Sequence, residues 1–248
     1  MIRFDSRVVV VTGAGGGIGL EIARGVLDLG GAVVGIDRKP RPEALTGDRA
    51  IYLQGDLRSE GVAAQAVAEA EGRFGRLDGL ANAAGVLWFE RDRSFAEIDW
   101  RVWDEVIAIN LTAAAAMARA CVPAMKRAGG GAMVHLSTIQ ALRGDDRPQD
   151  AYQAAKAGLI ALSKSIAIQF GGAGIRSNTV LPGPTHTPMQ ARWDADPARK
   201  SATARHVPLG RVGRAQDIAN ACLFLLSDAA GWITGTELIV DGGLTARP

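Results

Sequence analysis

The sequence between residues 8 and 19 runs Val8-Val9-Val10-Val11-Thr12-Gly13-Ala14-Gly15-Gly16-Gly17-Ile18-Gly19. The β-branched run predicts a strand buried on both faces, and the residues after the glycines have the apolar spacing of a helix. Glycines between a strand and a helix let the backbone approach a pyrophosphate, and the helix N-terminus offers unpaired N–H groups at the positive end of its dipole. Because no Gly-Lys-Ser/Thr follows, a P-loop is excluded. The stretch therefore predicts an α/β fold and a dinucleotide site formed by Gly13, Gly15, Gly16, Gly17, Ile18 and Gly19.

A second strand is predicted at residues 32–37, and it ends in Asp37. A carboxylate at this place can accept hydrogen bonds from the adenosine ribose and would repel a 2′-phosphate. Arg38 follows directly and could soften that preference. Residues 14–16 contain no basic side chain to hold a phosphate. These features predict NAD rather than NADP as the cofactor.

The remaining chain alternates between strands and helices. Further strands are predicted at residues 51–57, 77–85, 132–138, 174–183 and 237–240. Helices are predicted at residues 59–73, 99–128 (interrupted near Asn110), 150–170 and 215–226, while residues 184–210 are polar and less regular. This alternation predicts a doubly wound parallel sheet with helices on both faces. No linker or repeat divides the chain, so we expect residues 1–248 to form one domain.

Tyr152 and Lys156 lie four residues apart in a helical stretch, so they share one helix face. A free phenol has a pKa of about 10, and a nearby positive charge favours the phenolate. Such a pair can move a hydroxyl proton as an acid/base. Taken alone the pair is weak evidence, since an amphipathic tyrosine beside a solvated lysine has the same spacing.

Composition narrows the class of protein. The chain is 48% hydrophobic and 22% charged, and its net charge of +2 gives no reason to expect nucleic acid or a membrane as partner. No apolar run is long enough to span a bilayer. Cys121 and Cys222 lie far apart and match no zinc or redox spacing, so we expect buried free thiols, no metal site and a cytoplasmic location.

The motifs occur together in the order of a known family. The sequence resembles a short-chain dehydrogenase/reductase over essentially its full length. The matching residues are Thr12-Gly13 with Gly17-Ile18-Gly19, Asp56-Leu57, Asn82-Ala83-Ala84-Gly85, Asn110, Tyr152 with Lys156, Pro182-Gly183, Thr187, Thr234-Gly235 and Val240-Asp241-Gly242-Gly243.

The resemblance implies a Rossmann fold with seven central strands and a role for each matching residue. Tyr152 would be the proton donor and acceptor, and Lys156 would lower its pKa and hold the nicotinamide ribose. Asn110 would keep a water in place for a proton relay through Lys156. The other implied cofactor contacts are Arg38, Asp56 and Leu57 near the adenosine, Asn82, Ala83, Ala84 and Gly85 after the fourth strand, and Pro182, Gly183, Thr185 and Thr187 near the nicotinamide.

The sequence departs from the family pattern at two places. Ala83 replaces the usual second asparagine of the turn after the fourth strand. The family's serine normally lies thirteen residues before the tyrosine, where this chain has Ile139. Thr138 ends the strand next to it, so we expect Thr138 to be the catalytic hydroxyl, with Ser137 as the alternative.

The substrate is only loosely indicated. The family's substrate lid corresponds roughly to residues 188–208, which contain Trp193 and the acids Asp194 and Asp196. The basic residues there are Arg192, Arg199, Lys200, Arg205 and His206, and Arg143 and Arg147 follow the fifth strand. These cations suit an anionic substrate or are simply solvated. Trp88 and Phe89 either line the pocket or pack in the core, and His135 is expected to be structural.

Three functions remain open at this stage. The first is an NAD-dependent oxidoreductase for a secondary alcohol and its ketone. The second is an NADPH-linked reductase of a carbonyl or 3-oxoacyl thioester, and the third is a non-catalytic NAD-binding sensor or scaffold. In the family, helices like those at residues 110–128 and 152–170 pair between subunits, so a homotetramer is expected.

Overall fold

Strand β1 (Val8–Thr12) lies inside a seven-stranded parallel sheet in the computed structural model, which describes residues 2–247. The strand order is β3-β2-β1-β4-β5-β6-β9. The other strands are β2 (Ala32–Asp37), β3 (Ala50–Gln54), β4 (Gly79–Asn82), β5 (Gly131–Leu136), β6 (Ile175–Pro182) and β9 (Glu237–Val240). The predicted doubly wound Rossmann architecture is confirmed. Strand β3 ends three residues before the predicted limit, so Asp56 and Leu57 lie in the turn that follows it.

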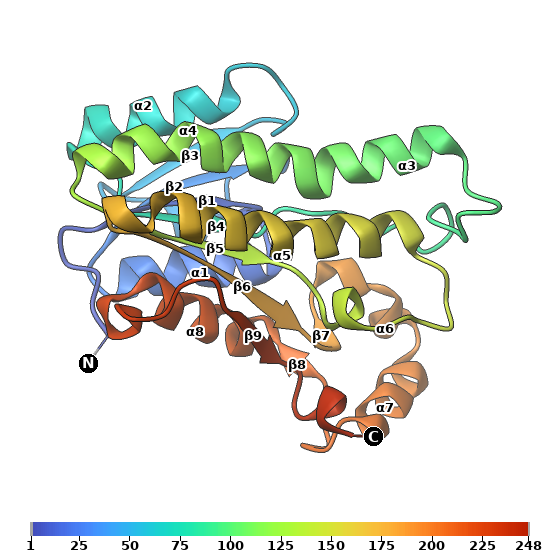
Figure 1. Cartoon of the computed structure of the whole chain (residues 1–248). Coiled ribbons are helices and arrows are strands. Elements are labelled where there is room, and N and C mark those ends of the chain that lie inside the picture. The colour runs from blue at the N-terminus through green and yellow to red at the C-terminus, as the bar shows by residue number, and fades with distance from the viewer. Residues whose placement is uncertain (1, 248) are drawn as a thin grey trace.

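Helices cover both faces of this sheet (Figure 1). Helices α1 (Gly17–Asp28) and α8 (Ala215–Leu226) pack on one face, while α2 (Val62–Phe74), α4 (Ala113–Arg127) and α5 (Asp150–Phe170) cover the other. In β1, Val9 and Val11 join the core under α1 and α8, whereas Val8 and Val10 join the core under α2 and α4. The continuous valine run is therefore the pattern of a strand buried on both faces.

The predicted interruption of the long helix is real. Helix α3 (Trp100–Ile107) passes into α4 through a π-helical turn at Ala108–Thr112 that contains Asn110. By length and composition the stretch Trp100–Arg127 could also cross a membrane. Instead Met117, Cys121 and Met125 are fully buried against the sheet, as in a covering helix of an α/β fold.

The segment expected to be irregular contains short elements. Strand β7 (Thr185–His186) pairs with β8 (Gly213–Arg214), and α6 (Arg192–Ala195) and α7 (Pro197–His206) lie between them. We call residues 188–208 the lid. Figure 1 shows α6 and α7 beyond the end of the sheet at which the parallel strands finish. Strand order reverses between β1 and β4, and such a reversal opens a crevice at the carboxyl ends of the strands.

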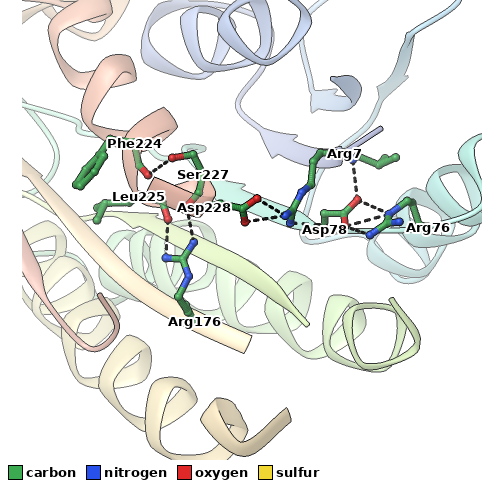
Figure 2. A network of polar contacts seen from close by, with 9 residues as sticks. Arg7, Arg76, Asp78, Arg176, Phe224, Leu225, Ser227 and Asp228 are labelled. Carbon is green, nitrogen blue, oxygen red and sulfur yellow. Dashed lines mark hydrogen bonds and ion pairs between the residues drawn. The ribbon is translucent and has the colours of Figure 1, made fainter. Parts of the chain in front are cut away.

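The opposite end of the sheet is held by ion pairs (Figure 2). Buried Asp78, just before β4, accepts a hydrogen bond from the backbone nitrogen of Val8 at 2.9 Å and pairs with Arg76 at 2.6 Å. Arg7 pairs with Asp228 at 2.6 Å. These contacts join the start of β1 to the start of β4 and to the turn after α8.

Arg176 extends this network from the start of β6 (Figure 2). Its guanidinium donates to the backbone oxygens of Leu225 at 2.8 Å and Ser227 at 2.9 Å. Carbonyls at a helix end lack intrahelical partners, and Arg176 satisfies two of them at the end of α8. The network is structural and lies at the amino ends of the strands, away from the crevice.

Candidate active site

A tight turn after β1 forms one wall of the candidate site. Gly13 has φ +73°, and a Cβ added there would lie 2.8 Å from the backbone nitrogen of Ala84. The Thr12 hydroxyl accepts hydrogen bonds from the backbone nitrogens of Ala83 and Ala84, both at 3.1 Å. Only glycine leaves room for so close an approach. The turn can therefore pack directly against the segment after β4, where the two hydrogen bonds from Ala83 and Ala84 hold it.

The amino terminus of α1 opens toward the same place. Within the described residues no side chain caps this helix at Gly16, and its first turn carries no acidic residue. A Cβ at Gly17 would lie 3.5 Å from Thr187 Cβ and 3.3 Å from Pro188 Cδ. Free N–H groups, a positive dipole end and a backbone without side chains suit the pyrophosphate of a dinucleotide. The residues present therefore fit a nicotinamide dinucleotide.

Asp37 ends β2 beside this turn. Its Oδ2 accepts a hydrogen bond from the Gly15 backbone nitrogen and its Oδ1 accepts one from that of Lys39, each at 3.0 Å. The Lys39 ammonium lies 3.5 Å from the position that a Cβ on Gly16 would take. Residues 14–16 have no basic side chain, but the structure nevertheless brings a cation beside them. The sequence analysis missed Lys39 because its proximity depends on the path of the loop after β2.

A cleft of about 1100 Å³ runs along the carboxyl ends of the strands. It is lined by most of the residues that were expected to contact cofactor or substrate: Gly13, Gly16, Gly17, Ile18, Gly19, Asp37, Arg38, Asp56, Leu57, Ala83, Ala84, Gly85, Ser137, Thr138, Tyr152, Lys156, Pro182, Gly183, Thr185 and Thr187. Trp88 and Phe89 line it too. Gly15, Asn82 and Asn110 are not among the lining residues.

Asp56 has a partner of its own at the adenosine end of the cleft. Its carboxylate accepts from the Arg58 guanidinium at 2.7 Å, and this hydrogen bond lowers the pKa of Asp56 to about 2. Arg38 lies farther away, at 3.9 Å. Asp56 is therefore negatively charged at neutral pH, and the guanidinium groups of Arg58 and Arg38 are the cations near it.

Tyr152 and Lys156 project from α5 into the cleft, and both are buried. The Lys156 ammonium donates to the backbone oxygen of Leu136 at 2.7 Å and lies 5.7 Å from the centroid of the Tyr152 ring. Burial raises the pKa of Tyr152 to about 12 and lowers that of Lys156 to about 8. The expected lowering of the phenol pKa is thus not found, because burial of the phenol outweighs the effect of its neighbours.

The two candidate hydroxyls at the end of β5 have different partners. Thr138 lies close enough to Tyr152 for its hydroxyl to lower the pKa of the phenol, against the effect of burial. The Ser137 hydroxyl donates to the backbone oxygen of Lys156 at 2.8 Å. Ser137 therefore fastens α5 to β5, whereas Thr138 lies beside the phenol. This geometry favours Thr138 as the hydroxyl that would contact a substrate.

Asn110 is fully buried in the π-helical turn behind Lys156. Its Nδ2 donates to the backbone oxygen of Val86 at 3.1 Å, and its Oδ1 accepts from the backbone nitrogen of Val86 at 3.0 Å. A Cβ on Gly85 would lie 2.6 Å from Asn110 Oδ1 and 3.2 Å from Lys156 Nζ. Asn110 and Lys156 therefore meet at Gly85, and π-helical turns are frequent at functional sites.

Asn82 is placed differently from the expectation. Its Nδ2 contacts the backbone oxygen of Ala114 at 3.0 Å and His135 Nδ1 at 3.1 Å, and the side chain is buried. It therefore joins β4 to α4 and β5 rather than facing the adenosine ribose. His135 is buried as expected, but its Nε2 has no hydrogen-bond partner among the described residues, and burial lowers its pKa to about 4.

Sequence comparison finds relatives over nearly the whole chain. A family model described as "Enoyl-(Acyl carrier protein) reductase" matches residues 13–245. The chain is 39% identical to cis-4-hydroxycyclohexanecarboxylate dehydrogenase from Sinomonas cyclohexanicum, covering 98% of both proteins. It is 37% identical to D-threitol dehydrogenase from Mycolicibacterium smegmatis, covering 99% of this chain and 95% of the relative. Other full-length matches carry the short-chain dehydrogenase/reductase name.

The chain belongs to the short-chain dehydrogenase/reductase family.

A solved structure agrees with this assignment. An Agrobacterium tumefaciens protein with bound NADP, provisionally described as a 2-deoxy-d-gluconate 3-dehydrogenase, matches this dehydrogenase/reductase with a TM-score of 0.88. Its sequence is 32% identical, and the match covers 99% of each chain. The present chain is therefore an oxidoreductase acting on hydroxyl or carbonyl groups with a nicotinamide dinucleotide.

Besides Lys39, a second residue near the site of this dehydrogenase/reductase gave no signal in the sequence. Asp92 lies in the loop after β4 and is fully buried. Its Oδ1 accepts from the backbone nitrogen of Ala151 at 3.1 Å, and its Oδ2 accepts from that of Tyr152 at 2.9 Å. A carboxylate at a helix N-terminus satisfies otherwise unpaired donors. Asp92 therefore orients the first turn of α5, which carries Tyr152.

Proposed function

We propose that this dehydrogenase/reductase interconverts a secondary alcohol and a ketone, with Tyr152 moving the hydroxyl proton. The proposal rests on one observation: Tyr152, Thr138 and Lys156 line the same cleft. The uncapped amino terminus of α1 opens onto that cleft. The nicotinamide ring supplies the hydride acceptor or donor when the dinucleotide is bound. The protein needs only to orient the reacting carbon and transfer one proton. The names of its relatives, which describe hydroxylated substrates, support this class of reaction.

Each side chain has a distinct part in the proposal. Thr138 and Tyr152 hold the substrate oxygen, and Tyr152 exchanges a proton with it. Lys156 would hold the cofactor ribose, and Asn110, which meets Lys156 at Gly85, would keep a water in place for a proton relay through Lys156. A non-catalytic NAD-binding sensor would have no use for these groups.

The proposal is tested by incubating the protein with NAD⁺ and a panel of secondary alcohols and following the absorbance of NADH. Formation of NADH with at least one alcohol is expected, and the product should be the matching ketone. A Thr138→Ala variant should lose more than about tenfold in kcat, since one hydrogen bond to the reacting oxygen is removed. No oxidation of any alcohol, and no reduction of any ketone with either reduced cofactor, would favour the sensor.

We propose NAD as the preferred cofactor. The Asp37 carboxylate is held in place by two backbone N–H groups and would repel a 2′-phosphate. The NADP-linked reductase of a carbonyl or 3-oxoacyl thioester is a second candidate, favoured specifically by the Lys39 ammonium beside Gly16. The two candidates differ in which cofactor binds more tightly.

Replacing Asp37 by serine decides between them. We expect the ratio of kcat/KM for NAD⁺ to kcat/KM for NADP⁺ to exceed one in the natural protein. In Asp37→Ser this ratio should fall roughly tenfold or more, because the repulsion of the phosphate is removed while Lys39 remains. A natural protein that prefers NADP⁺, with a ratio unchanged in the variant, would contradict the assignment.

A further inference from the structure

Four arginines gather in the part of the cleft that faces the lid. Arg143 and Arg147 come from the loop between β5 and α5, Arg192 begins α6, and Arg199 lies in α7. All four line the same cleft as Tyr152. We call them the arginine cluster. Arg147 and Arg199 lie close enough to Arg192 to act on its charge, and bringing like charges together costs free energy unless an anion offsets it.

Arg192 is the most enclosed member of the cluster. Its guanidinium lies over the ring of Phe89, 3.5 Å from the ring centroid, and its Nε donates to Gln190 Oε1 at 2.9 Å. These contacts fix the plane of the guanidinium. Among residues 2–247 its two terminal nitrogens have no hydrogen-bond partner. A planar guanidinium whose two terminal NH₂ groups have no protein partner can bind a carboxylate in bidentate fashion.

Three acidic side chains of these segments have hydrogen-bond or ion-pair partners of their own. Asp145 accepts from the Gln140 side chain and from the backbone nitrogen of Arg147. In the lid, Asp194 pairs with His186 at 2.8 Å, and Asp196 caps α7 and pairs with Arg199.

Asp145 and Glu90 offset part of the positive charge of the cluster, but among the described residues neither forms an ion pair with Arg192. In the part of the chain that the structure describes, Arg143, Arg147 and Arg192 form no ion pair. Burial lowers the pKa of Arg192, and Arg147 and Arg199 lower it further, while Asp145 and Glu90 act in the opposite sense.

The cofactor site does not account for this cluster. The start of the lid, Thr187 and Pro188, lies over Gly17 at the pyrophosphate end. Arg192 contacts a different wall, which is formed by the segment after β4 that contains Phe89. That wall also carries Trp88, which lines the cleft. The free guanidinium thus lies beside an aromatic surface suited to the carbon skeleton of a substrate.

We propose that Arg192, assisted by Arg147, binds a carboxylate of the substrate, so that this enzyme acts on hydroxy- and oxocarboxylates. The carboxylate lies on the part of the molecule away from the carbon that reacts at Tyr152. This inference rests on the alcohol/ketone oxidoreduction proposed above and specifies its substrate class.

The test compares hydroxycarboxylates with their methyl esters, which keep the carbon skeleton and lose the charge. Suitable probes are 4-hydroxycyclohexanecarboxylate, 3-hydroxybutyrate and the ester of each. The variants are Arg192→Gln and Arg192→Lys. Arg73→Gln, on the outer surface of α2, removes the same charge outside the cleft and serves as the control.

We expect the natural enzyme to prefer at least one acid over its ester. Arg192→Gln should lower kcat/KM for that acid roughly ten- to hundredfold, because one charge-assisted contact is lost. The kcat/KM for the ester should change by less than about threefold. Arg192→Lys should recover part of the loss, and KM for NAD⁺ should stay constant. Calorimetry should show that the NADH-loaded protein binds the acid and that Arg192→Gln does not.

Other outcomes overturn the inference in distinguishable ways. Equal losses for acid and ester mean that Arg192 only shapes the lid. A raised KM for NAD⁺ with both substrates means that it binds the cofactor. Tighter binding of a phosphate ester than of the carboxylate would identify a different anion. Oxidation of esters but not acids rejects the inference while leaving the proposed function intact, and no oxidation of either rejects the function itself.

Discussion

At the scale of single residues, the burial of Tyr152 determines what the site can do. A phenol with a pKa of about 12 is neutral at physiological pH and can donate its proton to a ketone oxygen. The reverse reaction requires the phenol to lose that proton first. The two directions should therefore respond differently to pH.

The pH dependence follows from this raised pKa. The fraction of Tyr152 present as phenolate grows as pH rises toward the folded pKa, so alcohol oxidation should accelerate with pH. We expect kcat/KM for oxidation to increase from about pH 7 to about pH 10, while ketone reduction stays flat or declines over the same range. Initial rates in both directions on one alcohol and ketone pair would check this. Oxidation that slows with rising pH would contradict the assigned role.

The sequence predicts those candidate site residues that carry a local signal. The Tyr152–Lys156 pair is recognised from the period of a helix. The glycines after β1 are recognised from the backbone conformation that a tight turn requires. Asp92 and Lys39 could not be found in this way, because they reach the site from loops whose path depends on tertiary packing. The same limit explains Asn82, whose motif suggested the cofactor but whose amide contacts α4 and His135.

At the scale of elements, the amino terminus of α5 depends on the loop after β4. Asp92 supplies the acceptors for the first N–H groups of α5, and burial raises the pKa of its carboxyl. The loop is thereby tied to the helix that carries Tyr152. The contact fixes the direction in which the phenol enters the cleft.

Replacing Asp92 tests this positioning role. We expect Asp92→Ala to lower kcat about tenfold or more and to lower the free energy of unfolding by about 1–3 kcal/mol, since two buried N–H groups lose their acceptor. Asp92→Asn keeps one acceptor and should recover part of kcat. Affinity for NADH should be unchanged in both variants. A loss of stability in Asp92→Ala with full kcat would show that the contact is structural only.

At the scale of the whole molecule, the alternation of strands and helices was sufficient to predict the sheet and its helical layers. The pattern could not predict the arrangement of the lid. Strands β7 and β8 and helix α6 are too short to show a period, and the polar helix α7 buries no residue and so has no apolar face to reveal it. The arginine cluster depends on that arrangement and became visible only in the structure.

Exposed apolar side chains favour the expected homotetramer. Ile168 on α5 is 86% exposed and Trp232, beyond α8, is fully exposed. A subunit contact of the expected homotetramer would bury such side chains. Light scattering should give about four times the 25.9 kDa mass of the chain. Trp232→Glu should yield a smaller assembly that remains folded, and a monomeric natural protein would contradict the prediction.

The central claim is that Tyr152 transfers the proton, and Tyr152→Phe tests it most directly. This change removes only the hydroxyl. We expect kcat to fall about 100- to 10,000-fold in both directions, the usual contribution of a general acid/base, while NADH affinity measured by fluorescence changes by less than about threefold. A phenylalanine variant that turns over at the natural rate would show that another group moves the proton.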